Sequence, residues 1–375
     1  MKYNYVAPCH FGLEKTLSFE VRKLGGEDIE VTDGRVFFSG GAEICAKANV
    51  FLSAAERVCV VLGRFRAESF DELFEGIRAL ELAEFIGRND QFPNTGHSLN
   101  SKLSSVPACQ KIVKKAMAVN LGKAYGMNVL PESGKLCQIR FSIMKNEVTL
   151  MLDTSGQGLH KRGYRRDSNL APIRETLAAG IVDIARVRER DIVCDPFCGS
   201  GTILIESALK ALNIAPGLNR GFAGEHMKFL PESVWRSARE EARSLIKKES
   251  GFRAVGYDID GECVELTRAN AEKAGVARFV TAKKRGIFDF SWDLSSPGAP
   301  IKIITNPPYG ERMLELEQAR ELYGVMGSKM LPLGGDRSLY VITPDSEFES
   351  VFGQKAVKNR KLYNGMLMCR LYSYY

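Results

Sequence analysis

Short apolar runs alternate with stretches of helical spacing through the C-terminal half of the chain, and this alternation limits the folds open to it. Beyond Ala171 the expected strands are residues 192–195, 254–258, 278–281, 301–305 and 338–343. The pattern predicts βαβ crossovers and a mostly parallel sheet, which binds ligands at the carboxyl ends of its strands. Asn364-Gly365 separates two further apolar runs and predicts a hairpin, so one of the last strands should be antiparallel.

The N-terminal residues follow a different order, β-α-β-β-α-β. Strand-like runs occupy residues 3–7, 29–32, 35–38 and 57–62, and helix-like stretches occupy 13–24 and 42–52. This order predicts a ferredoxin-like split unit. A helix at 69–80 and strands at 137–143 and 148–153 are expected next. We therefore divide the chain into a ferredoxin-like domain (1–62), a second α+β unit (63–154), a basic linker (155–170) and an α/β domain (171–375).

Composition excludes several classes of protein. The 375 residues are 45% apolar and 26% charged, which is typical of a globular chain of two or three domains. No apolar run approaches the roughly 18 residues of a membrane span, and the start lacks a signal-peptide core, so we expect a cytoplasmic enzyme. Nine scattered cysteines are expected to be reduced thiols that mostly pack. The four histidines lack zinc-ligand spacing, so we predict no metal.

Four residues directly after the run at 301–305 favour chemistry at a nitrogen atom: Asn306, Pro307, Pro308 and Tyr309. The Asn306 side-chain carbonyl and the proline-stiffened backbone carbonyl of Pro307 can accept hydrogen bonds from an exocyclic or amide nitrogen. Tyr309 can stack on a planar substrate. This tetrad is the predicted target site.

A second motif follows the strand at 192–195, from Asp195 through Gly199 to Gly201. The glycines permit close backbone approach, and the helix start behind them can receive a carboxylate. Asp258, at the end of the next strand, can accept bonds from both hydroxyls of a ribose. Asp289, after the third strand, either accepts a bond from an adenine amino group or is a turn or cap residue.

Methionine carboxylate, ribose and adenine, read in that order, describe S-adenosylmethionine. A dinucleotide fold would usually place its ribose acid about 20 residues after the first strand. The interval from Asp195 to Asp258 is much wider, because residues 213–252 look like an insertion with a helix at about 235–247. This spacing disfavours NAD.

Two basic stretches are candidate RNA surfaces. The segment 98–123 contains no acid and carries Lys102, Lys111, Lys114, Lys115 and Lys123. Lys111, Lys114 and Lys115 share one helical face, which is either a solvated surface or a surface for RNA phosphates. The glycine-rich stretch 156–166 contains Arg162 and Arg165, and it is either a flexible linker or a basic surface between two domains.

These motifs resemble those of class I methyltransferases that carry an N-terminal THUMP domain. The resemblance rests on Asp195 to Gly201, Gly256 to Asp260, Asn306 to Arg312, and the flanking segments Gly158 to Arg165 and Ala171 to Ala178. It is strongest to the guanine-N2 methyltransferase part of the bacterial large-subunit rRNA enzymes of the RlmL type, and it spans essentially the whole chain. A second methyltransferase module, fused at the C-terminus of some such enzymes, is lacking.

The resemblance implies a THUMP RNA-binding domain at 63–154 and a seven-stranded, Rossmann-like methyltransferase sheet at 171–375. It implies that the target base meets Asn306, Pro307, Pro308 and Tyr309. It also implies a cofactor site for S-adenosylmethionine made of Asp195, Phe197, Gly199, Ser200, Gly201, Asp258, Ile259, Asp289 and Asn306. The expected partner is 23S rRNA or a large-subunit precursor.

Other functions share parts of this pattern. The tetrad also serves adenine-N6 methylation of DNA and glutamine methylation of release factors, and only the N-terminal half separates these from RNA methylation. Carbon methylation of pyrimidines needs a thiolate nucleophile at the target motif, where this chain has Pro-Pro-Tyr. Guanine-N2 methylation of tRNA remains the main alternative. A non-catalytic RNA-binding protein with a degenerate methyltransferase fold is the second.

Overall fold

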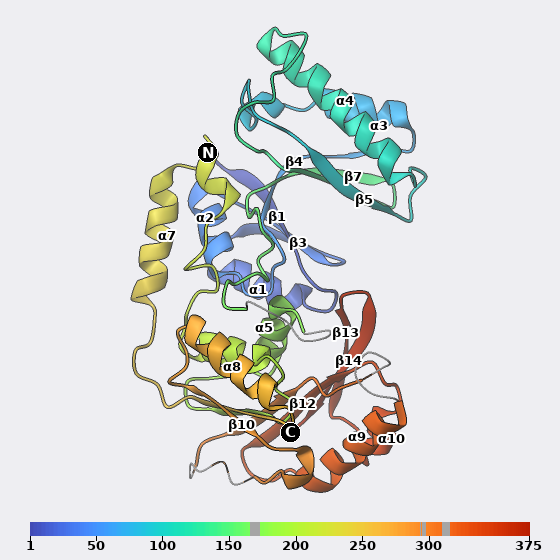
Figure 1. The fold of residues 1–375 in the computed structure, drawn as a ribbon. Coiled ribbons are helices and arrows are strands. Elements are labelled where there is room, and N and C mark those ends of the chain that lie inside the picture. The colour runs from blue at the N-terminus through green and yellow to red at the C-terminus, as the bar shows by residue number, and fades with distance from the viewer. Residues whose placement is uncertain (166–172, 293, 295–297, 310–315) are drawn as a thin grey trace.

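The structure, a computed structural model, contains two seven-stranded sheets, one in each half of the elongated molecule (Figure 1). It describes residues 1–165, 173–292, 294, 298–309 and 316–375. The end of the predicted linker, Ala171-Pro172 and Gly310 to Arg312 lie outside the described residues. No helix among the described residues has the length and apolar character that crossing a membrane requires.

The first sheet joins two units edge to edge, in the order β2-β3-β1-β4-β7-β6-β5. Its strands are β1 (Tyr3–Pro8), β2 (Glu27–Thr32), β3 (Arg35–Gly40), β4 (Cys59–Arg66), β5 (Asn94–Leu99), β6 (Ile139–Met144) and β7 (Glu147–Asp153). Helices α1 (Glu14–Lys23) and α2 (Ala42–Phe51) complete the predicted β-α-β-β-α-β order, which is confirmed. β4 is the last strand of this order, and its pairing with β7 makes the sheet continuous.

The second unit packs α3 (Phe70–Arg78), η1 (Leu82–Glu84) and α4 (Val106–Tyr125) over its strands. The predicted helix at 69–80 is confirmed as α3, which begins where the Ser69 hydroxyl accepts a bond from Glu72 N at 3.2 Å. Leu73 and Ile77 form its buried face. Figure 1 shows α3 and α4 at the end of the molecule farthest from the second sheet.

The second sheet has the order β10-β9-β8-β11-β12-β14-β13. Its strands are β8 (Ile192–Asp195), β9 (Arg253–Asp258), β10 (Val280–Lys284), β11 (Ile301–Thr305), β12 (Arg337–Thr343), β13 (Lys358–Asn364) and β14 (Leu367–Tyr374). β8 to β12 are parallel, and β14 runs antiparallel to both neighbours, so the predicted mostly parallel sheet is confirmed. The predicted hairpin is also confirmed, with Gly365 at φ 66°.

Helices flank this sheet in the expected alternation. They are α5 (Glu175–Ile184), α6 (Thr202–Ala211), α7 (Glu232–Ser244), α8 (Gly261–Lys273), α9 (Leu316–Met330), α10 (Phe348–Phe352), η2 (Ala223–His226) and η3 (Ile287–Asp289). The helix predicted within the insertion at 213–252 is α7. The predicted third strand begins two residues later than expected, at Val280. All nine cysteines are buried and none forms a disulfide, as expected.

One hydrophobic core runs from the first sheet into the second half of the molecule. It includes Leu13 and Leu17 of the N-terminal domain together with Leu177 and Ile181 of α5. A Cβ at Gly180 would lie 2.4 Å from Leu13 Cδ1, so any larger residue here would displace the buried Leu13 side chain. The two halves are therefore packed against each other rather than merely tethered.

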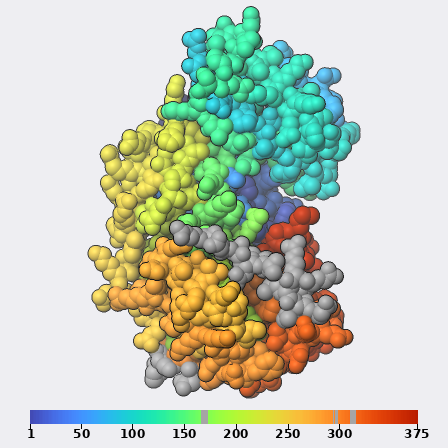
Figure 2. All heavy atoms as spheres, viewed as in Figure 1, coloured from blue at the N-terminus to red at the C-terminus, as the bar shows by residue number. Residues whose placement is uncertain are grey.

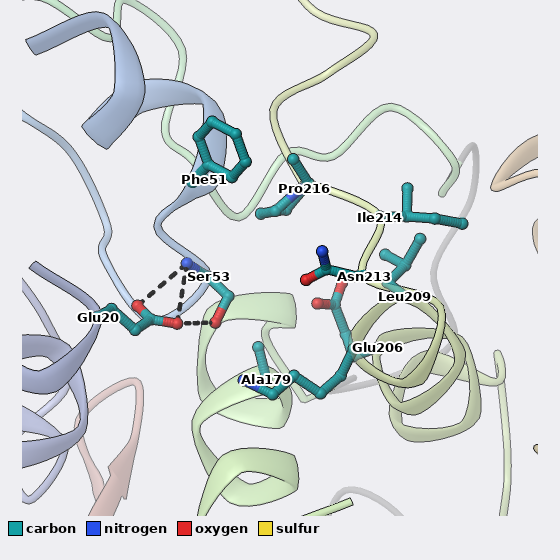
Figure 3. A pocket seen from close by; sticks show the side chains of 11 residues that line it. Glu20, Phe51, Ser53, Ala179, Glu206, Leu209, Asn213, Ile214 and Pro216 are labelled. Atoms are coloured by element: carbon teal, nitrogen blue, oxygen red, sulfur yellow. Dashed lines mark hydrogen bonds between the residues drawn. The ribbon is translucent and has the colours of Figure 1, made fainter. Parts of the chain in front are cut away.

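A cavity of about 90 Å³ lies in the seam between α1, the end of α2, α5 and α6 (Figure 3). The Glu20 carboxylate accepts bonds from Ser53 N, at 3.3 and 3.2 Å, and from the Ser53 hydroxyl. Burial, followed by the charge of Asp183, raises the pKa of Glu20 to about 7. The folded protein therefore holds this proton more tightly than the unfolded chain does.

That difference in proton affinity predicts that the free energy of unfolding depends on pH through Glu20. Stability should fall as the pH rises from the unfolded pKa of Glu20 through about 7, because folding then costs a buried charge. Glu20→Gln should exceed the wild type in free energy of unfolding by roughly 1 to 3 kcal/mol near pH 8 and approach it near pH 5. Urea unfolding at both pH values measures this, with the exposed Glu272→Gln as control. An unchanged pH slope in Glu20→Gln would contradict it.

Candidate functional site

The predicted functional residues come from neighbouring strands of the second sheet. β8 lies between β9 and β11 and ends at Asp195, β9 ends at Asp258, and β11 leads directly into Asn306. Because these strands are parallel, their carboxyl ends lie at the same edge of the sheet. The structure thus brings the two sequence motifs together.

A direct hydrogen bond joins the two motifs. Thr305 Oγ1, one residue before the tetrad, donates to Asp195 Oδ1 at 2.6 Å, and Phe197 N donates to the same oxygen at 3.1 Å. Burial raises the pKa of Asp195 to about 7, and these two bonds oppose the rise. Thr305 therefore fixes the tetrad relative to the cofactor turn. Sequence reasoning missed this role because only strand pairing reveals it.

The turn after β8 has the shape expected of a backbone cradle. Gly199 and Gly201 have φ of 52° and 79°, in the left-handed region. Helix α8 holds the turn from behind: Thr267 Oγ1 donates to Gly199 O at 2.8 Å, and Asn270 Nδ2 donates to Ser200 O at 2.9 Å. A Cβ at Gly199 would meet no atom within 4 Å, so the described residues leave open space beside the turn.

The predicted ribose residue, Asp258, lies next to this turn. Asp258 Oδ2 accepts a bond from Gly199 N at 2.9 Å, which links the ends of β8 and β9. Ile259 is 74% exposed, and Asp289 is exposed in η3. Phe288, which sequence reasoning did not single out, is also 55% exposed. Two exposed apolar side chains beside the sheet edge are suited to cover a purine ring.

The tetrad presents an unused acceptor. Asn306 Oδ1 is buried and has no hydrogen-bond partner within the described part of the chain. A buried carbonyl without a donor is costly, so this atom is suited to receive one from a substrate. Tyr323 Oη donates to Pro308 O at 3.4 Å. Asn364 Nδ2 donates to Tyr309 Oη at 3.1 Å, and burial raises the pKa of Tyr309 to about 12.

Two of the predicted RNA-binding lysines have internal partners. Lys114 Nζ lies 2.6 Å from Glu132 and 3.5 Å from the centre of the Phe92 ring, and Lys102 is paired with Glu68. Glu132 and Glu68 lie outside the acid-free segment 98–123, so the sequence of that segment did not reveal these ion pairs. Lys111 and Lys115 are exposed and have no ion pair among the described residues. The predicted RNA surface therefore retains Lys111 and Lys115 as its unneutralised members.

The two predicted linker arginines face the protein interior. Arg162, with its side chain 3% exposed, lies 3.4 Å from Glu206 and donates to Leu159 O and Ser53 O. Arg165 donates to Thr202 Oγ1 at 3.0 Å and pairs with Glu175 at 3.2 Å. The expected exposed basic surface is thus not formed by these side chains, because buried acids of α5 and α6 bind them.

The hairpin β13–β14 carries charge that sequence reasoning overlooked. Residues 355–375 contain five basic residues and no acid, namely Lys355, Lys358, Arg360, Lys361 and Arg370. All five are exposed, and none forms an ion pair with another described residue. The same acid-free criterion that selected residues 98–123 would have found this segment.

A metal site has no support from side-chain clustering. Among the described residues, no group of three or more His, Cys, Asp or Glu side chains is placed to hold a metal ion.

Three family models match successive parts of the chain. They are the RlmL ferredoxin-like domain at residues 4–59, the THUMP domain at 67–153, and the RMKL-like methyltransferase domain at 162–373.

Individual relatives agree with these models. A candidate RNA methyltransferase of Bacillus subtilis, YpsC, is 40% identical over 100% of this chain and 96% of its own length. The ribosomal RNA large subunit methyltransferase K/L of Shewanella amazonensis is 30% identical over 98% of this chain. The chain spans about half of that enzyme, 52%.

A solved structure, SMU.472 complexed with SAH, is 39% identical to this chain. It has a TM-score of 0.91 and covers 100% of this chain and 98% of its own. Together with the methyltransferase family model, this likeness identifies the cofactor of the present chain as S-adenosylmethionine. The glycine turn with open space beside it and the exposed Ile259 and Asp289 fit that cofactor.

Proposed function

This chain belongs to the RMKL-like methyltransferase family, and we propose that it transfers a methyl group from S-adenosylmethionine to the exocyclic N2 of a guanine in 23S rRNA. The observation that carries the nitrogen target is the buried Oδ1 of Asn306, which has no hydrogen-bond partner among the described residues. Thr305, the residue before it, is bonded to Asp195 of the cofactor turn. The THUMP match at 67–153 and the named activity of the K/L relatives support an rRNA substrate. We retain residues 62, 154 and 170 as the proposed domain ends.

In this proposal, different residues bind different parts of the cofactor. The turn from Asp195 to Gly201 holds the methionine end, Asp258 holds the ribose, and Asp289 with Ile259 holds the adenine. When bound, S-adenosylmethionine supplies an activated methyl group on a sulfonium. Phe197 and Ser200 shape the turn, since Phe197 is partly buried against the hydrophobic cluster of the second sheet and Ser200 is buried within the turn.

The target nitrogen needs electrostatic help rather than a strong base. Its lone pair is delocalised into the guanine ring, so it becomes more tetrahedral and positive as it attacks. Asn306 Oδ1 and the Pro307 carbonyl accept its hydrogen bonds and stabilise that charge, a contribution of a few kcal/mol for a well-aimed group. Tyr309, next to Pro308, stacks on the flipped base. The methylated product is acidic enough to lose its proton to water.

Nucleoside mass spectrometry of separated rRNA and tRNA from a deletion strain tests the substrate. We expect N2-methylguanosine to decrease in 23S rRNA and to return when the gene is restored. Loss from tRNA alone would support the tRNA alternative and refute ours. No loss from either, combined with no binding of S-adenosylmethionine in calorimetry, would favour a non-catalytic RNA-binding protein.

The exposed lysines of α4 give a separate prediction. Lys111→Glu/Lys115→Glu should weaken rRNA binding. It should also make the negative slope of log K against log salt shallower, by roughly 0.7 to 0.9 for each lost phosphate contact. Binding titrations at several salt concentrations measure this. Lys273→Glu/Lys329→Glu, which reverses two exposed lysines elsewhere, is the control. Equal salt slopes for both double variants would assign Lys111 and Lys115 to a solvated face.

A further inference from the structure

A second cavity, of about 600 Å³, lies where the tip of the hairpin β13–β14 meets the ferredoxin-like domain. Its walls include His10, Phe11, Glu56, Arg174, Tyr363 and Met366. Figure 1 shows the red hairpin reaching up to the blue N-terminal region, and Figure 2 shows red atoms against blue on the molecular surface. The cavity is thus formed by segments from opposite ends of the chain.

The contact that forms this cavity is specific. A Cβ at Gly12, which has φ 90°, would lie 2.3 Å from Lys361 O, so the loop can approach the hairpin only with glycine at this position. Arg360 Nη1 donates to Gly12 O at 3.1 Å. The loop after β1 is therefore held against β13, and Phe11 is placed by that contact.

Aromatic and apolar surface is available inside the cavity. The rings of Phe11 and Tyr363 are 5.7 Å apart at an interplanar angle of 61°. Phe11 nevertheless remains 45% exposed, and Met366 at the hairpin tip is 99% exposed. Exposed aromatic surface of this kind covers planar rings well, and base stacking is its most common use in proteins that bind single-stranded nucleic acid.

Positive charge surrounds this apolar surface. Lys361 Nζ lies 5.4 Å from the centre of the Tyr363 ring, and the five basic residues of the hairpin segment have no acid among them. Arg174 lies 3.0 Å from Glu56, which is also bound by His10. The charged groups Arg174 and Glu56 that line the cavity are therefore paired, while the hairpin cations form no ion pair with a described residue and can bind phosphates.

The cavity is linked to the target site. Asn364, the neighbour of Tyr363, donates the 3.1 Å hydrogen bond to Tyr309 Oη. The end of β13 therefore contributes to both the cavity and the target site. A nucleic acid bound at Tyr309 has this cavity beside it.

We propose that this cavity binds one unpaired base of the substrate RNA, next to the nucleotide whose base enters the tetrad. Phe11 stacks on that base, Tyr363 contacts its edge, and the hairpin cations hold the adjoining phosphates. The proposal rests on the proposed RNA methylation. It makes the ferredoxin-like domain part of substrate recognition through the loop that contains Phe11.

Methylation kinetics with protein-free 23S rRNA from a deletion strain test the proposal. Phe11→Ala should raise KM for the rRNA roughly five- to 100-fold, the range expected for one lost stacked base. The affinity for S-adenosylmethionine should stay unchanged. Phe11→Trp should retain a low KM because it keeps an aromatic surface. Phe19→Ala is the matched control, since Phe19 is 58% exposed on α1 and does not line the cavity.

The outcomes separate this proposal from the proposed function. If the wild type methylates rRNA and Phe11→Ala has the KM of Phe19→Ala, the base pocket is refuted while the enzyme assignment stands. If the wild type methylates neither rRNA nor tRNA, the proposed function is refuted, and the base pocket, which rests on it, is refuted with it. A KM effect seen only with ribosomal particles, and absent with protein-free rRNA, would indicate a protein contact and also refute the pocket. Thermal unfolding of each variant verifies folding.

Discussion

Asn306→Ala is expected to lower kcat for methyl transfer by at least a hundredfold while leaving the affinity for S-adenosylmethionine nearly intact. The buried Oδ1 has no partner among the described residues, so its task in this scheme is to accept a bond from the target amine. Loss of one such aimed group costs about 3 to 4 kcal/mol in activation free energy, or 10²- to 10³-fold. Single-turnover methylation and calorimetry measure the two quantities separately.

Controls make this result specific to the acceptor. Asn128→Ala, at an exposed position after α4, should behave as the wild type. Asn306→Ala should not be less stable, because it removes a buried oxygen that has no hydrogen-bond partner in the described part of the chain. An Asn306→Ala enzyme with wild-type kcat would mean that another group holds the amine.

Gly201→Ala should weaken binding of S-adenosylmethionine by tenfold or more. Gly201 has φ 79°, and a Cβ there would lie 2.7 Å from Thr267 Cγ2. The strain of about 1 to 2 kcal/mol and the clash would together displace the turn or α8. Because Thr267 also donates to Gly199 O, the displacement would reach the backbone that faces the cofactor. Calorimetric titration with S-adenosylmethionine and with its demethylated product measures the loss.

Gly275→Ala separates backbone strain from the clash. Gly275 has φ 71°, but a Cβ there would meet no atom within 4 Å. Gly275→Ala should lose about 1 to 2 kcal/mol of stability from backbone strain alone and retain full cofactor affinity. If both glycine variants bind the cofactor as the wild type does, the turn does not form its site.

The parallel sheet and its edge could be predicted because their signals are local. The runs that form β8, β9 and β11 are short and apolar and end in polar residues, so period and position alone indicate strands and strand ends. Asn364-Gly365 likewise specifies its hairpin from two residues. Strand β5 gave no such signal. Its sequence, from Asn94 to Leu99, is polar, and as an edge strand it leaves alternate side chains exposed.

Contacts between distant segments escaped prediction for a different reason. Glu132 lies 18 residues after Lys114, and Glu206 lies 44 residues after Arg162, so counting charge within a segment could not detect either pairing. The same is true of Thr305 with Asp195, 110 residues apart. The distance in sequence between Phe11 and Tyr363 hid the second cavity altogether. Such contacts follow from tertiary packing, which no local pattern encodes.

The most direct measurement is a crystal structure of the protein with S-adenosylhomocysteine, the product of methyl transfer. We expect the ligand along the ends of β8 and β9, with its carboxylate at the Gly199 to Gly201 turn, its ribose at Asp258 and its sulfur facing Asn306 Oδ1. A ligand bound elsewhere, or one whose sulfur is screened from Asn306 by the protein, would contradict the placement of the amine and with it the proposed chemistry.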